Sequence, residues 1–250
     1  MDMQSFSQFM IFAAFISLVI YTFGDKISRN KLRIKKIEYW LIDGIGLTTQ
    51  GVIIPLLQAT LVYALYHYLF PHFQGCLQIP AIISFMISFI VIDYVYYWNH
   101  RLLHSRVFWN IHQIHHTITE MDVLGTSRNT IWTSFLIIYL WIHPLFIYLL
   151  ADPTAYLFGV ALTSALDLWR HSGLIISEHN ILVAILSPWL ILPQDHIWHH
   201  SADNKNCNYG ANLKIWDKIH GTYYQNQQLP QKLGINTSLN LFQQLLFPFI

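Results

Sequence analysis

Long apolar runs alternate with short polar segments along this chain, and their lengths predict a bundle of membrane helices. A membrane-spanning helix needs about 20 mostly apolar residues. Five runs approach or reach this length, at residues 6–23, 51–70, 80–98, 130–150 and, more briefly, 154–169. We expect 181–192, which contains a proline, to be interfacial or re-entrant, and the tail 239–250 to lie at the membrane interface. The pattern predicts an all-α integral membrane bundle of four to five transmembrane helices with added interfacial helices.

Basic residues predict how this bundle is oriented. Six of the twelve residues in the segment 25–36 are Lys or Arg. Short loops rich in Lys and Arg stay in the cytoplasm. Counting helices forward from this loop puts residues 99–129 and 170–250 on the same side. The segment 99–129 carries three arginines of its own, which agrees with that orientation. The membrane would be a bacterial inner membrane or the endoplasmic reticulum.

Composition excludes two classes of protein. The chain has 250 residues, of which 54% are hydrophobic and 11% charged, against about 25% charged in soluble domains. A chain this apolar cannot stay disordered. Its 14 Lys and Arg against 13 Asp and Glu leave no basic footprint for nucleic acid. The 14 histidines equal the Lys and Arg count, and only His67, His72 and His143 fall away from the predicted cytoplasmic side.

Eight of these histidines form three clusters with helical spacing. The clusters are His100 with His104, then His112 with His115 and His116, and finally His196 with His199 and His200. Residues three and four apart share one face of a helix. We therefore expect each cluster to project two or three imidazoles in one direction.

The clusters predict a metal centre. Neutral imidazole is the commonest metal ligand in proteins, and it suits iron, zinc, copper and nickel. Eight imidazoles exceed what one tetrahedral zinc can use, so two metal ions are the economical interpretation. The alternative, unconnected surface histidines, suits a single pair better than three clusters on one membrane face.

Other residues near the clusters are further candidates. His171 follows the run 154–169 on the same face and is a candidate ninth ligand. Asp167, one helical turn earlier, would bind a metal, orient a ligand, or be a solvated residue at a helix end. His179 is either a ligand or an interfacial loop residue. His143 lies inside a membrane run before a proline, where a packing role is expected.

Several known catalytic patterns are absent from the sequence. The zinc-protease motif HExxH, the phosphate-binding P-loop, the motif GxGxxG and the hydrolase elbow GxSxG do not occur. Cys76 and Cys207 are predicted on opposite faces and should not pair.

Two functions are open for a metal centre in a membrane protein: redox catalysis, or metal binding or transport without redox catalysis. Transporters normally place ionisable ligands near the bilayer midplane, whereas these histidines lie at cytoplasmic helix ends.

Ordered motifs between residues 87 and 224 closely resemble the fatty acid hydroxylase / sterol desaturase superfamily. They are DYVYYWNHRLLH at 93–104, WNIHQIHH at 109–116, PQDHIWHHSAD at 193–203, NYG at 208–210 and WDKIHGT at 216–222. The element DLWRHSG at 167–173 is similar to the sterol C4-methyl oxidase and cholesterol hydroxylase branch. Two departures bear on the subfamily: His220 replaces a bulky apolar residue, and Asn129-Thr130 replaces His-Pro after Arg128.

The resemblance implies an integral membrane oxygenase with a histidine-ligated non-haem di-iron centre on the cytoplasmic side. Such enzymes use O2 and two external electrons to hydroxylate or desaturate a C–H bond of a sterol, fatty acyl or related lipid. Zinc would be a possible substitute for iron in purified protein. The residues matching the family's ligands are His100, His104, His112, His115, His116, His171, His196, His199 and His200. Asn208, Tyr209, Gly210, Trp216 and Asp217 would support the site structurally.

The resemblance divides the chain into three regions. Residues 1–86 would hold membrane helices and the basic cytoplasmic loop, 87–224 the catalytic domain, and 225–250 an interfacial tail. The expected partners are the membrane, a lipid substrate and an external electron donor, which would be cytochrome b5-like, a ferredoxin or a reductase. The loop 26–36 would either dock this donor or lie on the membrane surface.

Overall fold

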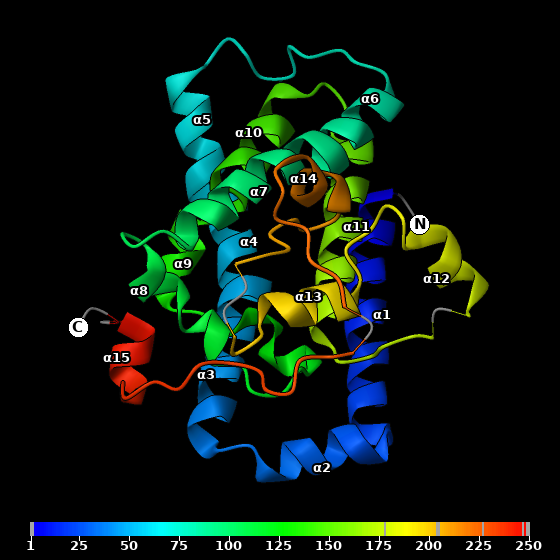
Figure 1. Cartoon of the computed structure of the whole chain (residues 1–250). Helices are drawn as coiled ribbons and strands as arrows, with labels where there is room; N and C mark the ends of the chain where they lie inside the picture. Colours follow the sequence, from blue (N-terminus) through cyan, green and yellow to red (C-terminus); the bar gives the residue numbers. More distant parts are fainter. Residues whose placement is uncertain (1–2, 178, 204–205, 227, 247, 249–250) are drawn as a thin grey trace.

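Helices make up the regular structure of the computed structural model, which describes every residue except 1–2, 178, 204–205, 227, 247 and 249–250 (Figure 1). Among the described residues no strand forms, and only three isolated β-bridges occur. Four helices are long and apolar enough to cross a membrane: Phe6–Gly24, Ile37–Leu69, Ala81–Leu103 and Ile131–Leu149. The predicted all-α membrane bundle is therefore confirmed.

The fifth predicted span is a helix but does not meet the same test. It forms α11 (Thr154–His171), which lies beside α1 (Met3–Gly24) (Figure 1). Asp167, Arg170 and His171 stand in its last turns and lower its mean hydropathy. The described part of the chain thus contains four candidate spans, and α11 packs against α1 and the span 81–103.

The second predicted span begins much earlier than the sequence suggested. Its helix is continuous from Ile37 to Leu69, through α3 (Ile37–Thr48), η1 (Thr49–Ile53), α4 (Ile54–Leu57), η2 (Gln58–Val62) and α5 (Tyr63–Leu69). At 1.5 Å per residue it is about 50 Å long, well beyond the roughly 30 Å hydrocarbon core. Asp43 interrupts the apolar residues in the first part of this helix, so the apolar pattern alone places the start of the helix too late.

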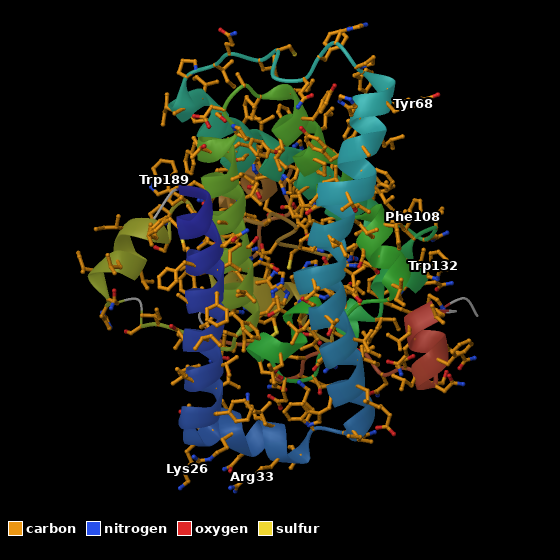
Figure 2. The ribbon with its side chains drawn as sticks, turned by 180° about the vertical axis from the view of Figure 1, so that it is seen from behind. Lys26, Arg33, Tyr68, Phe108, Trp132 and Trp189 are labelled. Carbon is orange, nitrogen blue, oxygen red and sulfur yellow. The ribbon has the colours of Figure 1, made fainter. Side chains whose placement is uncertain are left out.

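The predicted basic loop 25–36 is largely helical, which corrects that expectation. Helix α2 (Lys26–Ile34) lies across the end of the bundle between α1 and α3 (Figure 1). The Asp25 carboxylate accepts a hydrogen bond from the Ser28 amide at 2.8 Å and so caps the helix. Lys26 and Arg33 project outward at this end, and Tyr68 marks the opposite end (Figure 2).

Four charged side chains form a buried cluster behind α2, which we call the Asp43 cluster. Arg128 donates to both carboxylate oxygens of Asp43, at 2.6 and 2.9 Å. Lys35 contacts Asp43 at 2.5 Å and Asp122 at 2.9 Å. Each of these side chains is at most 9% exposed. Lys35 is therefore not part of the free basic surface, and the cluster ties the N-terminal helices to the segment that follows the second histidine cluster.

Helix α3 also packs closely against η5 (Val123–Ser127) at one glycine. A Cβ atom at Gly46 would overlap the backbone carbonyl oxygen of Ser127, whereas a Cβ at Gly44 would meet nothing within 4 Å. Only a residue without a side chain allows this approach.

We expect Gly46→Ala to destabilise the protein by about 1–3 kcal/mol, because the backbone of η5 would have to move. Gly44→Ala is the matched control on the same helix. It should be neutral or slightly stabilising, since alanine favours helices. Thermal unfolding in one detergent measures both; equal melting temperatures for the two variants would contradict the close approach.

The helix 131–149 is broken beside the histidine clusters, which the predicted run 130–150 did not show. It divides into α9 (Ile131–Leu136) and α10 (Tyr139–Leu149). The Asn99 side chain donates to the Leu136 carbonyl at 3.0 Å and accepts from the Ile138 amide at 3.2 Å. It satisfies backbone groups that the break frees, as a membrane segment requires.

The remaining helices are short, apart from the one at 92–103, and four of them carry clustered histidines. They are α6 (Ala81–Met86), η3 (Ile87–Val91), α7 (Ile92–Leu103), α8 (Trp109–His112), η4 (His115–Thr117), α12 (Ile181–Leu186), α13 (Pro193–His199), α14 (Lys214–Ile219) and α15 (Leu241–Leu246). The expected interfacial segments 181–192 and 239–250 contain α12 and α15, although 247, 249 and 250 lie outside the described residues.

Candidate metal centre

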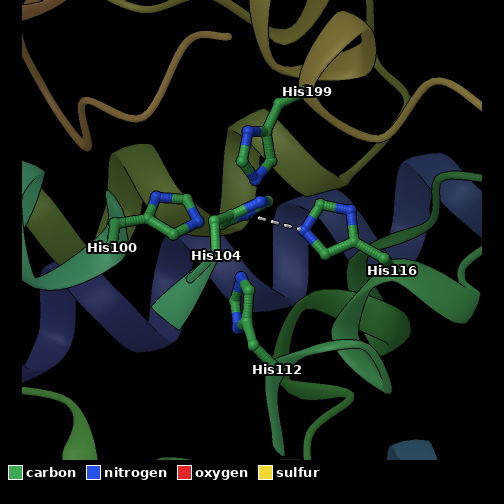
Figure 3. A group of neighbouring side chains, drawn as sticks. All are labelled: His100, His104, His112, His116 and His199. Atoms are coloured by element: carbon green, nitrogen blue, oxygen red, sulfur yellow. Dashed lines mark hydrogen bonds between the residues drawn. The ribbon is translucent and has the colours of Figure 1, made fainter. Parts of the chain in front are cut away.

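Nine histidines converge in two neighbouring groups. The first holds His100, His104, His112, His116 and His199; the second holds His115, His171, His196 and His200. Within each group the candidate ligand nitrogens all lie within 4.8 Å of one another. The five rings of the first group point toward a common centre (Figure 3). Each group could hold a metal ion.

The groups divide the sequence clusters in a regular way. Histidines four residues apart share a group: His112 with His116, and His196 with His200. The middle histidine of each three-histidine cluster, His115 in one and His199 in the other, belongs to the opposite group. Adjacent residues on a helix are about 100° apart. Each cluster thus projects two imidazoles toward one centre, within the expected two or three, and the adjacent histidine of the second and third clusters diverges toward the other centre.

Backbone carbonyls fix the orientation of four rings. Nδ1 of His100 donates to the Tyr209 carbonyl at 2.8 Å, and Nδ1 of His199 donates to the Cys207 carbonyl at 2.7 Å. The same bond joins His115 to the Arg128 carbonyl at 3.2 Å and His171 to the Asp167 carbonyl at 2.9 Å. A carbonyl only accepts, so Nδ1 carries the proton and Nε2 keeps a lone pair. Metal-ligating histidines are held in this way.

The lone pairs of two such rings face each other. Nε2 of His115 lies 3.3 Å from Nε2 of His171, yet both rings use their proton at Nδ1. No hydrogen bond can form between them, and two facing lone pairs repel. Imidazole nitrogens that share one ion at right or tetrahedral angles lie about 2.8–3.4 Å apart. The donor set therefore fits a bound cation.

Burial keeps seven of these rings neutral and ready to bind a metal. Eight of the nine are at most 7% exposed, and only His104 is half-buried. Burial lowers the pKa of His104 to about 2, of His115 to about 3 and of His199 to about 4. It also lowers the pKa of His112, His116, His196 and His200 well below the ordinary value. An unprotonated imidazole is the form that ligates.

These shifts predict how stability depends on pH. Below pH 6.5 the unfolded chain takes up protons on histidines that stay neutral in the folded, metal-free chain. The free energy of unfolding should therefore fall as pH drops from 7 toward 4.5. Thermal unfolding of metal-free protein at several pH values tests this. A melting temperature that is constant over this range would contradict buried neutral rings.

The loop after α13 is held in a fixed conformation, and two of its backbone carbonyls orient rings of the first group. The Asp217 carboxylate accepts hydrogen bonds from the Tyr209 and Gly210 amides, both at 2.8 Å. Asn208, at a φ of 55°, donates from its side chain to the Asp195 carbonyl at 2.7 Å. Asp93 holds the same loop through the Asn212 amide at 2.7 Å. The stretches 208–210 and 216–217 thus have the supporting position that the sequence suggested.

The remaining candidate residues lie outside both groups. Asp167 is 44% exposed; its carboxylate binds Arg170 at 2.9 Å, and its carbonyl orients His171. His179 is exposed and joins neither group. His143 is buried in α10, where its Nδ1 lies 2.9 Å from the Tyr156 hydroxyl, which agrees with a packing role. Cys76 and Cys207 do not form a disulfide bond with each other.

Sequence reasoning missed the Asp43 cluster. The Arg128 carbonyl orients His115, and its guanidinium is held by Asp43 from a helix 85 residues earlier. One signal was present: a carboxylate inside an apolar helix is costly, and its presence points to a partner.

Comparison with known proteins identifies the family of this chain. The model of the fatty acid hydroxylase family matches residues 85–222, which include all nine clustered histidines. The chain belongs to the fatty acid hydroxylase family. No solved structure matches it.

Curated relatives resemble only part of the chain. The ornithine lipid hydroxylase of Rhizobium tropici is 30% identical over 151 residues, which are 59% of this chain and 44% of that protein. The human alkylglycerol monooxygenase is 29% identical over 170 residues, 65% of this chain and 35% of that protein. The zebrafish (Danio rerio) alkylglycerol monooxygenase is 26% identical over 174 residues, 67% and 37% respectively. The chain thus spans less than half the length of these relatives.

Proposed function

We propose that this protein is a membrane-bound, O2-dependent lipid hydroxylase or desaturase with a histidine-ligated di-iron centre. The observation that carries the proposal is the pair of histidine groups with facing lone pairs. Family membership and relatives named as lipid hydroxylase and monooxygenases support it. An unactivated C–H bond needs a redox metal, because no side chain attacks it unaided.

The nine imidazoles of the two groups would hold the two ions. When bound, iron supplies the redox chemistry that activates O2 toward a C–H bond. The residues of this chain do the remaining work. The carbonyls of Tyr209, Cys207, Arg128 and Asp167 keep the protons at Nδ1 and aim Nε2 at the ions. Burial of the rings excludes water, which protects reactive species from side reactions.

We further propose that the centre faces the cytoplasm and is reduced by an external donor. Helix α2 carries Lys26, Arg29 and Arg33 at its exposed surface, which favours a cytoplasmic location. The segment after His116 contacts the same helix, since Glu120 pairs with Lys31 at 2.6 Å. A cytochrome b5-like protein, a ferredoxin or a reductase would supply the two electrons.

The test combines metal analysis with lipid analysis. We expect two iron ions per chain after expression in iron-replete cells. We also expect an O2-dependent mass change of 16 units for hydroxylation, or loss of two hydrogens for desaturation, in membrane lipids of cells that express the protein. Comparing a deletion strain with its parent by lipid mass spectrometry would identify the substrate.

Two outcomes would contradict this function. If protein purified after expression with iron and with zinc contains no bound metal, the proposed metal centre is wrong. Metal flux into liposomes without lipid oxidation would instead favour a transport protein.

A further inference from the structure

A polar cleft lies beside α13, the helix that carries His196 and His199. It has a volume of about 420 Å³, and residues of α12, α13, α14 and the segment after α14 line it. Asp195, in the first turn of α13, lines the cleft and directly precedes His196. The cleft is thus separate from the two histidine groups but shares a helix with them.

The charges in this cleft favour an anion. The Lys214 ammonium is buried and paired with Asp195 at 2.8 Å, and it also donates to the Tyr223 hydroxyl at 3.1 Å. Lys218, one helical turn later, also lines the cleft. Its ammonium contacts the Pro188 carbonyl at 3.3 Å, and no carboxylate among the described residues forms an ion pair with it. Two cations against one carboxylate leave a net charge of +1.

One wall of the cleft belongs to α12, a helix with an exposed apolar surface. Ala184, Ser187 and Pro188, from α12 and the turn after it, line the cleft. Val183 is buried, whereas four other side chains of this segment face outward: Ile181, Leu182, Ile185 and Trp189 are 59–69% exposed. Trp189 stands on the outside of the molecule (Figure 2). In a membrane protein, such a helix with an adjacent Trp is typical of the interface between acyl chains and headgroups.

We propose that this cleft binds the anionic headgroup, a phosphate or carboxylate, of a membrane lipid. The apolar surface of α12 would contact the acyl chains, while Lys218 and Lys214 would face the anion. A monoanionic phosphodiester matches the net charge of the cleft. Ammonium groups bind such oxygens with charge-assisted hydrogen bonds.

The experiment measures lipid binding to the purified full-length chain in detergent. The probes are fluorescent phosphatidylglycerol and fluorescent diacylglycerol with the same acyl chains. We expect phosphatidylglycerol to bind more tightly, and Lys218→Gln to weaken it by about fivefold, the effect of one lysine near an anionic lipid. Lys218→Gln should leave diacylglycerol binding unchanged. Lys232→Gln is the matched control, because Lys232 is exposed and lies outside the cleft.

Three results would overturn the proposal. They are equal affinity for the two lipids, unchanged phosphatidylglycerol binding in Lys218→Gln, and an equal loss in Lys232→Gln. Inorganic phosphate that displaces the lipid at concentrations near the lipid's own Kd would assign the cleft to a free anion instead. Binding needs neither metal nor turnover. The result is therefore independent of whether the oxygenase function is correct.

Discussion

Replacing His199 by alanine should lower lipid oxidation by more than about 100-fold and should leave one metal ion per chain. His199 belongs to the five-histidine group, and the Cys207 carbonyl aims its Nε2 into that group. Changing a residue that only supports a metal ligand already costs about 10–100-fold, and loss of a ligand should cost more. His200→Ala should have the same effect on activity by emptying the other group. Metal analysis and product mass spectrometry measure both consequences.

His179→Ala is the matched control, because His179 is exposed and lies outside both groups. It should keep two ions and full activity. Free imidazole added to His199→Ala should restore part of the metal content, because it fits the space left by the ring. A misfolded variant would not respond in this way. Full activity of His199→Ala, or loss of metal in His179→Ala, would contradict the assignment of the groups.

The metal groups could be predicted in large part because their signal is local. Spacings of three and four residues place histidines on neighbouring positions of a helix whatever the rest of the chain does. The same spacing was not enough to assign each ring to an ion. That division depends on how α7, α8, η4, α11 and α13 meet in the fold. The contact between His115 and His171, which are 56 residues apart in the sequence, is one example.

Membrane helices were also predictable, except where charge interrupted the apolar pattern. Asp43 stands in the first part of the helix 37–69, and that part was missed. The interruption is compatible with the fold only because Lys35 and Arg128 come to it from other segments. Contacts of this range leave no periodic pattern in a sequence. The break at Ile137 was missed for a related reason, since Asn99 stabilises it from another helix.

Arg128→Met should destabilise the protein by about 3–5 kcal/mol, the usual cost of breaking a buried ion pair by removing one partner. The Asp43 cluster contains two cations and two carboxylates, so the variant would leave it with a net charge of −1. His115 should also lose its firm orientation, because the Arg128 carbonyl holds its ring. We therefore expect a lower melting temperature together with loss of metal from the four-histidine group.

Lys31→Gln is the control, because the exposed Lys31–Glu120 pair joins the same two segments. Exposed pairs contribute about 0–1 kcal/mol, so this variant should change the melting temperature little. The double variant Asp43→Leu/Arg128→Met distinguishes two possible causes of the lower stability of Arg128→Met, uncompensated buried charge and loss of the pair's shape and hydrogen bonds. It leaves Lys35 paired with Asp122 at 2.9 Å and a cluster without net charge. If uncompensated buried charge is the cause, the double variant should be more stable than Arg128→Met alone. A double variant that is less stable would instead mean that the shape and hydrogen bonds of the pair hold α3 to η5.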